Sequence, residues 1–144
     1  MDRADEPMDS PTPWVRKHIR TYVDSGGTKG TKFYGVQSLL LTTRGRRSGQ
    51  QRRTALYYGQ DGDRYLVVAS NGGAQSHPSW YLNLTAHPDV TVQVGPEVFA
   101  AVASTAEPAD KPRLWQIMTG LYPTYDDYQR KARREIPLVI LTPG

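Results

Sequence analysis

A β-hairpin near the middle of the chain constrains the fold more than any other feature of the sequence. The run "RTALYYG" over residues 53–59 alternates between apolar and polar side chains, and "RYLVVAS" over 64–70 is a second β-rich run. Between them, "QDGD" over 60–63 holds an Asp-Gly pair, which favours a tight turn because glycine tolerates positive φ. The sequence therefore predicts two antiparallel strands here, in a sheet built from neighbouring strands.

Further runs predict the remaining elements. Apolar and β-compatible residues indicate strands over 35–43, 89–94, 98–105 and 136–142. Short helices are expected over 14–24, 76–87 and 111–122, and in the first and last of these apolar residues recur at helical spacing. We expect Ser76 to cap the second of these helices and Pro78 to lie in its first turn, and we expect a further helix or turn from Pro123.

The order of these elements predicts a mainly β fold with short helices, of the α+β class. It is not the alternating βαβα order of a Rossmann domain, and no G-x-G-x-x-G follows the first strand. A small barrel would leave few free edges and a cleft at its rim. We predict a disordered tail over 1–13, which holds three prolines and four acids; a helix and a glycine-rich connector over 14–32; and one barrel domain over 33–144.

Composition excludes several classes of site. The chain has no cysteine, so it has neither a disulfide nor a thiolate metal site. His18, His77 and His87 do not have the spacing of metal ligands, and we predict no metal. The N-terminus carries no signal-peptide hydrophobic region, and no apolar run reaches the length of about 18 residues typical of a membrane helix. We therefore expect a cytoplasmic protein.

The decapeptide "RGRRSGQQRR" over 44–53 carries the basic excess of the chain. It holds five arginines and no acid, whereas the other residues hold 13 basic against 14 acidic side chains. Glycines allow a sharp turn with exposed backbone N–H groups, and arginine forks match phosphate oxygens. The pattern indicates a cradle for one small phosphorylated molecule; a solvated basic hairpin and a nucleic-acid grip are the alternatives.

Tyrosines form the second group of candidate site residues. "LYPTYDDY" places Tyr122, Tyr125 and Tyr128 three residues apart, and Tyr57 lies on the strand after the arginines. A phenol can stack on a flat substrate, donate a hydrogen bond or act as a weak acid. The alternative is an aromatic seam between a helix and the barrel.

Four blocks together resemble the deazaflavin-dependent nitroreductases of actinobacteria, which use coenzyme F-420, an 8-hydroxy-5-deazaflavin. The blocks are "LLTTRGRRSGQQRRTALYY", "VVASNGG", "HPSWYLNLTAHPDVTVQV" and "LYPTYDDYQRKARREIPLVIL", in matching order and spacing. They cover nearly the whole chain after the N-terminal segment. The resemblance implies a split β-barrel, like those of flavin- and deazaflavin-binding oxidoreductases, with the coenzyme in a groove at its rim.

The resemblance also implies roles for particular residues. Those that would contact the phosphate and acidic tail of the coenzyme are Arg46, Arg47, Ser48, Gly49 and Arg52. Those that would line its ring and linker are Ala55, Ala69, Ser70, Asn71, Gly72 and Gly73, with Trp80 packed nearby. The aromatic positions facing the substrate would be Tyr57, Tyr122, Tyr125 and Tyr128. Ser70 and Tyr125 are the candidate catalytic groups near the hydride acceptor.

The chain departs from the family pattern at two places. Family members often carry lysine where this chain has Arg47 and Asn71. Arg47 preserves the charge but Asn71 removes it, so we expect a weaker or rearranged grip on the coenzyme tail. The helix over 14–24 is short and basic where some relatives have a more apolar, membrane-associated one. We expect it to pack on the barrel or on a neighbouring subunit; peripheral contact with an anionic membrane is the alternative.

The expected function is that of an oxidoreductase. The resemblance implies hydride transfer from the reduced deazaflavin to an electron-poor acceptor, such as a quinone or a nitroaromatic or nitroimidazole compound. A flavin mononucleotide-dependent oxidoreductase on the same barrel is one alternative. A non-catalytic barrel that binds single-stranded nucleic acid through its tyrosines is the other.

Overall fold

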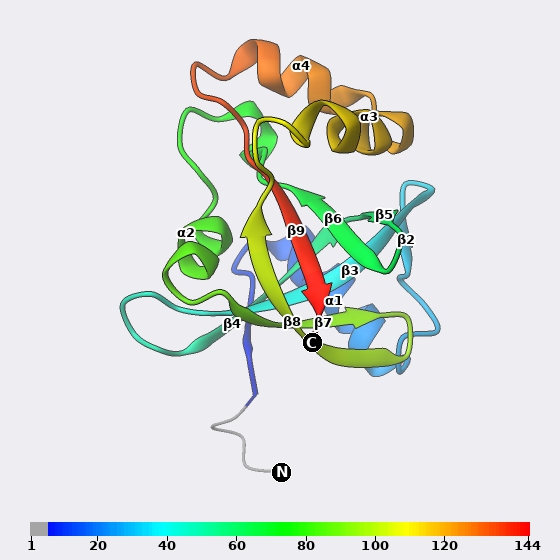
Figure 1. The fold of residues 1–144 in the computed structure, drawn as a ribbon. Helices are drawn as coiled ribbons and strands as arrows, with labels where there is room; N and C mark the ends of the chain where they lie inside the picture. The colour runs from blue at the N-terminus through cyan, green and yellow to red at the C-terminus, as the bar shows by residue number, and fades with distance from the viewer. Residues whose placement is uncertain (1–5) are drawn as a thin grey trace.

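The computed structural model describes residues 6–144, and a curved sheet of nine strands forms its centre (Figure 1). Along the sheet the strand order is β1-β4-β3-β7-β8-β9-β6-β5, and β2 pairs with β3. All pairs are antiparallel except β1 with β4. The strands are β1 (Met8–Asp9), β2 (Lys32–Phe33), β3 (Val36–Arg44), β4 (Gln51–Tyr57), β5 (Gly59–Asp61), β6 (Arg64–Val68), β7 (Asp89–Val94), β8 (Glu97–Thr105) and β9 (Leu138–Pro143).

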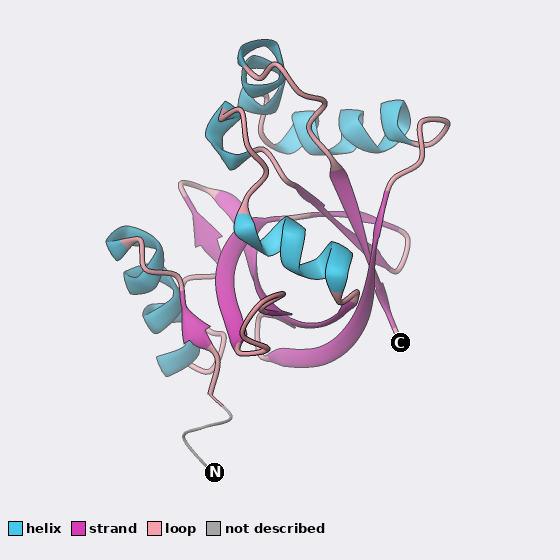
Figure 2. Ribbon diagram, turned by 90° about the vertical axis from the view of Figure 1, so that its left-hand side faces the viewer, coloured by secondary structure: helices cyan, strands magenta, loops and turns pink. Residues whose placement is uncertain are grey.

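Helices cover the sheet on three sides. Figure 2 shows α2 lying across one open end of the curled sheet, while α3 and α4 sit together above it and α1 lies against its outer face. The helices are α1 (Pro13–Asp24), α2 (Ser79–Ala86), α3 (Lys111–Leu121) and α4 (Thr124–Lys131), with a short 3-10 turn at Asn71–Gly73. Every predicted strand and helix is present, with boundaries moved by a few residues. The predicted hairpin partner differs, however: the run over 53–59 is divided, so that β4 pairs with β3 and the short β5 pairs with β6 across the Asp-Gly turn.

Alternation along β3 explains how these layers are held together. Leu39 and Leu41 are fully buried inside the barrel, in a cluster with Val67, Val92 and Val139. Leu40, between them, points outward because successive side chains of a strand face opposite sides. There it packs with Ile19 and Tyr22 of α1. The strand is thus buried on both faces, as its continuous apolar run indicates. A third cluster, which includes Leu114, Met118 and Leu138, joins α3 and α4 to the sheet.

Two expectations about local structure differ from what is observed. Ser76 does not cap α2, which begins at Ser79 after an extended Pro78 (ψ 151°). The cause is steric, since the residue before a proline disfavours helical backbone, and His77 precedes Pro78. The disordered tail predicted over 1–13 also differs in its second part: Met8 and Asp9 form β1, and α1 begins at Pro13. Residues 1–5 lie outside the described part.

Candidate active site

Two adjoining clefts contain most of the predicted site residues. The first, of about 650 Å³, opens between the β3–β4 turn, residues 8–12 and the start of α2. The second, of about 360 Å³, lies between α1, β4 and the tyrosines beside α3 and α4. Thr54 lines the first cleft and Ala55 the second; Asn71 lines the first and Gly72 the second. Because these neighbours are consecutive in the chain, the two clefts adjoin along β4 and along the turn after β6, and we refer to the pair of clefts as the trough.

The arginine loop forms the wall of the first cleft. The Gly45 N–H donates to the Gln50 carbonyl (2.8 Å), and the Gly49 N–H donates to the Gly45 carbonyl (2.9 Å). A Cβ on Gly45 would come within 2.9 Å of that Gln50 oxygen, so only glycine allows this tight turn. The buried amide of Asn83 in α2 then fixes the loop: its Oδ1 accepts from Arg46 N (3.2 Å) and Arg46 Nη1 (3.0 Å).

The cationic groups of this cleft are only partly neutralised. Arg53 pairs with Asp9 at 2.6 Å. Within residues 6–144, by contrast, no carboxylate lies within 4.0 Å of Arg46, Arg47 or Arg52. Three arginines with no acidic partner in the described chain leave positive charge at this end of the trough, which favours an anion.

Four tyrosines form the inner wall of the second cleft. The Tyr122 ring lies 5.0 Å from the rings of both Tyr57 and Tyr125, and the Tyr122 and Tyr128 hydroxyls are 3.3 Å apart. Tyr125 is only 5% exposed, and it packs in the cluster beneath α3 and α4 while also lining the cleft. The aromatic seam between helix and barrel and the lining of the second cleft, alternatives from the sequence, are therefore formed by the same tyrosine rings.

Three of these phenols, those of Tyr57, Tyr125 and Tyr128, have raised pKa values. Burial raises the pKa of Tyr125 far above its usual value, and neighbouring tyrosines raise it further. The hydrogen bond with Tyr122, together with burial, raises the pKa of Tyr128 to about 12. Burial also raises the pKa of Tyr57. Because a phenol is protonated below its pKa, these three tyrosines present hydrogen-bond donors and no negative charge near neutral pH.

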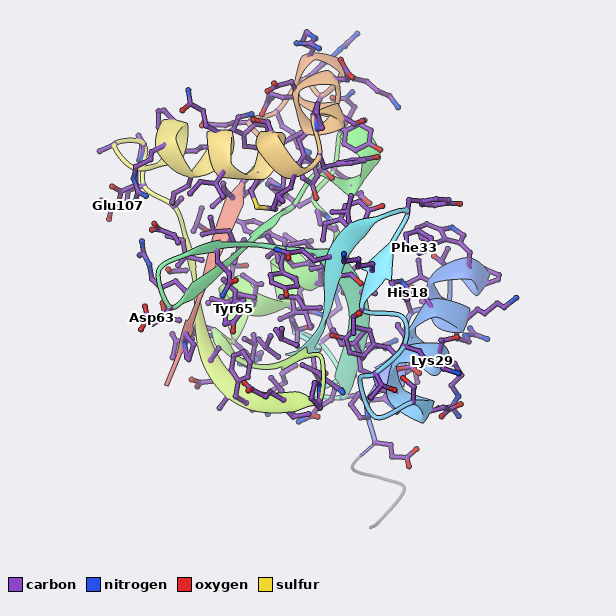
Figure 3. The ribbon with its side chains drawn as sticks, turned by 90° about the vertical axis from the view of Figure 1, so that its right-hand side faces the viewer. His18, Lys29, Phe33, Asp63, Tyr65 and Glu107 are labelled. Atoms are coloured by element: carbon purple, nitrogen blue, oxygen red, sulfur yellow. The ribbon has the colours of Figure 1, made fainter. Side chains whose placement is uncertain are left out.

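A second aromatic group faces the tyrosines across the cleft, and sequence reasoning missed it. Phe33 of the β2–β3 hairpin stacks on Trp14 (5.5 Å, 12°) and on His18 (4.8 Å, 18°) of α1. Figure 3 shows His18 and Phe33 side by side between α1 and that hairpin. Trp14 is 61% exposed and Tyr34 is 87% exposed, so this wall is open to solvent. No spacing signal could have joined segments 14–18 and 33–34, since the chain folds back between them.

The turn after β6 separates the two ends of the trough. Asn71, Gly72 and Gly73 all have positive φ (49°, 63° and 80°). A Cβ on Gly73 would lie 3.2 Å from the Tyr128 backbone, so the turn packs closely against α4. Although the Asn71 side chain is exposed, it is held in place because its Nδ2 donates a hydrogen bond to the Ser76 carbonyl (3.1 Å).

The predicted site residues thus fall into three groups. Those lining the first cleft are Arg46, Arg47, Ser48, Arg52, Asn71 and Trp80. Those lining the second are Ala55, Tyr57, Ser70, Gly72, Tyr122, Tyr125 and Tyr128. Three line neither cleft: Gly49 forms the loop turn, Ala69 is fully buried, and Gly73 packs on Tyr128. The structure adds two residues that the sequence did not indicate: Asn83, which holds the arginine loop, and Arg134, which forms hydrogen bonds to the turn after β6.

Comparison with solved structures defines the class of fold. The chain superposes on a putative pyridoxamine 5'-phosphate oxidase from Listeria innocua with a TM-score of 0.55, at 14% identity, over 88% of this chain and 94% of that one. It therefore has the split-barrel fold. A solved structure described as a domain-swapped dimer is nearer, with a TM-score of 0.71 and 37% identity over 92% of this chain and 99% of that one.

Sequence comparison narrows the class to a family. Residues 14–143 match the family described as F-420H(2)-dependent quinone reductase, and the chain belongs to that family. It is 43% identical over 132 residues to a protein of Mycobacterium tuberculosis named F-420H(2)-dependent quinone reductase, which covers 89% of each chain. The resemblance stated from the four sequence blocks is thereby confirmed.

Proposed function

We propose that this chain binds reduced coenzyme F-420 along the trough and reduces a quinone in the second cleft. The observation that supports this most directly is the asymmetry of the trough. One end carries three arginines with no acidic partner in the described chain, and the other is lined by neutral tyrosines. This donor set fits a coenzyme with an anionic tail and a planar ring. When bound, the reduced deazaflavin supplies a hydride, and the protein supplies orientation and electrostatics.

The arginine loop would hold the tail of the coenzyme. Arg47 lies in the β3–β4 turn and Arg52 at the start of β4; both are exposed and line the first cleft. Asn83 keeps the Arg46 backbone fixed, so the loop is ordered before an anion arrives. Such preorganisation lowers the entropic cost of binding.

Tyr125 would act as a hydrogen-bond donor to the acceptor. Reduction by hydride places negative charge on a quinone oxygen, and a preorganised donor in a buried site stabilises that charge. The raised pKa of Tyr125 keeps its hydroxyl protonated, so it can donate but cannot act as a base near neutral pH. Ser70, which lines the same cleft, is the second candidate donor. The wall of Trp14, Phe33 and Tyr34 would favour flat apolar acceptors, with nitro compounds reduced as incidental substrates.

A titration tests the ligand assignment. Trp80 lines the first cleft and Trp14 the second, so tryptophan fluorescence reports on both ends of the trough. We expect oxidised coenzyme F-420 to quench this fluorescence at lower concentration than flavin mononucleotide does. Tighter binding of flavin mononucleotide, or a purified protein that retains bound flavin, would overturn the assignment in favour of the flavin alternative.

The double variant Arg47→Ala/Arg52→Ala tests the tail site. We expect it to fold normally and to bind oxidised coenzyme F-420 at least about tenfold more weakly, since even one hydrogen bond to a charged group is worth about 1.5–3 kcal/mol and about 1.4 kcal/mol is a factor of ten. The matched control is Lys17→Ala/Arg20→Ala, which removes two positive charges from the exposed face of α1. Equal affinity in the arginine-loop variant and the wild type would refute the tail assignment.

None of the helices within residues 6–144 has both the length and the apolar character needed to cross a bilayer. The chain's expected cytoplasmic location stays a prediction, and peripheral membrane contact through α1 stays an alternative.

A further inference from the structure

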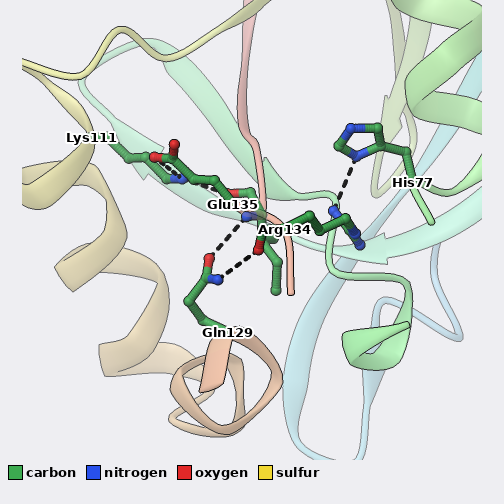
Figure 4. A network of polar contacts seen from close by, with 6 residues as sticks. His77, Lys111, Gln129, Arg134 and Glu135 are labelled. Atoms are coloured by element: carbon green, nitrogen blue, oxygen red, sulfur yellow. Dashed lines mark hydrogen bonds and ion pairs between the residues drawn. The ribbon is translucent and has the colours of Figure 1, made fainter. Parts of the chain in front are cut away.

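Arg134 forms several hydrogen bonds to the turn after β6. Its Nε donates to the Ala74 carbonyl (3.0 Å), and its Nη2 donates to the carbonyls of Ser70 (2.9 Å) and Ala69 (3.3 Å). Its Nη1 lies 3.0 Å from His77 Nδ1, the contact drawn in Figure 4. One side chain therefore binds three carbonyls of a single turn and the ring nitrogen of His77 just beyond it, although Arg134 is about 60 residues away in sequence.

The backbone of Arg134 is itself tied to the tyrosine helix. Gln129 of α4 donates from Nε2 to the Arg134 carbonyl (2.9 Å), and its Oε1 accepts from the Ile136 N–H (2.9 Å). Figure 4 shows Gln129 making both bonds to this segment. Gln129 directly follows Tyr128, which lines the second cleft. The two residues thus join the Ser70 turn to the helix that carries Tyr125.

This arrangement has a consequence for the trough. Three carbonyls of the turn accept hydrogen bonds from Arg134, so they point away from a ligand in the cleft. Among residues 6–144, no hydrogen bond uses the N–H groups of Asn71 or Gly72. Unpaired N–H groups in consecutive residues of a turn form a concave donor surface for an electronegative ligand atom. The charge of Arg134 has no carboxylate within 4.0 Å in the described chain, so it adds to the positive potential at the turn.

We infer that Arg134 is a positioning residue of the active site. It fixes the Ala69–Ala74 turn so that Ser70 and the N–H groups of Asn71 and Gly72 are available to the bound coenzyme. Through Gln129 it also sets the distance between that turn and the tyrosines of α4. This inference rests on the proposed function for the identity of the ligand, but the positioning itself is a property of the protein alone.

His77 provides an internal reporter of this contact. Since the guanidinium can only donate, His77 Nδ1 accepts and the ring proton resides on Nε2. Burial, and then the nearby Arg134 charge, lower the pKa of His77. Loss of the guanidinium should therefore raise the pKa of His77 and change its tautomer preference.

Three variants test the inference. Arg134→Met removes the guanidinium; Arg134→Lys keeps the charge but cannot reach three carbonyls at once. Arg133→Met is the matched control, because the exposed Arg133 side chain makes no hydrogen bond within residues 6–144. For each we would measure the amide resonances and hydrogen exchange of Asn71, Gly72 and Gly73 in the ligand-free protein, the His77 titration, and the affinity for oxidised coenzyme F-420.

We expect Arg134→Met to shift the three amide resonances, raise the pKa of His77 and weaken coenzyme binding about tenfold or more, because a misplaced binding group costs about that much. Arg134→Lys should recover part of the affinity, and Arg133→Met should match the wild type throughout. Should Arg134→Met not fold, the amide shifts of Arg134→Lys decide. Unchanged amides and affinity in the Arg134 variants would overturn the inference. A wild type that fails to bind the coenzyme would instead refute the proposed function, while the amide and His77 measurements would still judge Arg134.

Discussion

At the scale of single residues, Tyr125 shows how one side chain serves both packing and the site. Its ring belongs to the cluster beneath α3 and α4, yet it also lines the second cleft. Burial of the ring is what raises the pKa of its hydroxyl. The packing that stabilises the helix pair therefore also keeps the phenol protonated.

Replacing Tyr125 with phenylalanine separates these two contributions. We expect Tyr125→Phe to retain coenzyme affinity and to lower kcat for quinone reduction about 100-fold, the typical cost of losing one preorganised donor. The wild-type rate should not show a step from tyrosine ionisation between about pH 6 and 9, because the pKa lies far above that range. Steady-state kinetics against pH would check both. Tyr65→Phe, in the barrel beside Tyr58 and Phe99, is the control.

Site residues that lie close together in the sequence could be predicted, whereas those that contact partners far along the chain could not. Arg46, Arg47 and Arg52 are recognisable because five arginines fall in ten positions. Asn83 and Arg134 each look like an ordinary polar residue of a helix or loop. Their partners lie 37 to 65 residues away, and such separations leave no local pattern.

At the scale of elements, α1 is fastened to the barrel by a close backbone contact. The Tyr22 hydroxyl accepts a hydrogen bond from Gly95 N (2.6 Å) in the β7–β8 turn and lies 3.3 Å from the Ser38 carbonyl, to which it donates. A Cβ on Gly27 would lie 1.9 Å from the Gly95 carbonyl oxygen. The loop after α1 can therefore approach this turn only because residue 27 has no side chain.

We expect Gly27→Ala to destabilise the protein by about 3 kcal/mol or more, since the added carbon meets backbone and the φ of +82° is unfavourable for alanine. Gly26→Ala, at φ +65° with open space around it, should cost only about 1–2 kcal/mol for the backbone alone. Urea unfolding of the two variants measures the difference. Equal losses would mean that the contact with Gly95 does not hold α1 in place.

Asp61 connects another pair of elements, the β5–β6 hairpin and α3. It accepts hydrogen bonds from Arg113 (2.8 and 3.1 Å) and pairs with Arg64. These bonds, that from Arg113 foremost, lower the pKa of Asp61 from 3.8 to about 2. A lowered pKa contributes stability that is present above pH 3.8 and is lost as the pH falls through about 2. Near neutral pH the ionised Asp61 therefore makes its full contribution to the stability of the fold.

We expect Asp61→Asn to unfold at lower temperature than the wild type at pH 7. The difference should shrink between about pH 4 and 2, where the Asp61 carboxylate takes up a proton first in the unfolded chain and then in the folded protein. Thermal unfolding followed by circular dichroism across that range is the measurement. Asp63→Asn, which alters an exposed carboxylate with no ion pair within residues 6–144, is the control. A difference that persists unchanged at pH 2 would contradict this account.

Elements were easier to predict than their ends. Alternation and the Asp-Gly turn determine β6 and its neighbours, because the period of the side chains follows directly from the strand. Helix starts depend on local sterics, which is why Ser76 was wrongly expected to cap α2. The pairing of Met8 and Asp9 with β4 could not be predicted from their acidic, proline-rich surroundings.

At the scale of the whole molecule, positive charge is concentrated and not spread. The decapeptide carries five of the 18 basic residues, and the others are outnumbered by 14 acids. Arg46, Arg47 and Arg52 line one concave cleft, and Arg53 is already paired with Asp9. A long polyanion gains affinity from many spaced contacts, which this surface does not offer.

We therefore expect a short single-stranded oligonucleotide to bind with a Kd of about 10⁻⁴ M or weaker at physiological salt, in the range of non-specific association. Fluorescence anisotropy with a labelled oligonucleotide, compared with coenzyme titration in the same buffer, is the check. Tight binding with a steep salt dependence would instead favour the nucleic-acid alternative, and the tyrosine assignments would then have to be revised.

The short β1 strand has a practical consequence for handling the protein. Met8 and Asp9 pair with Arg52 and Arg53, and residues 8–12 form part of the rim of the first cleft. A polyhistidine tag fused before Met1 would therefore extend the same end of the chain that forms this rim. The end of β9 at Pro143 lines neither cleft, so purification and affinity measurements should use a tag placed after Gly144.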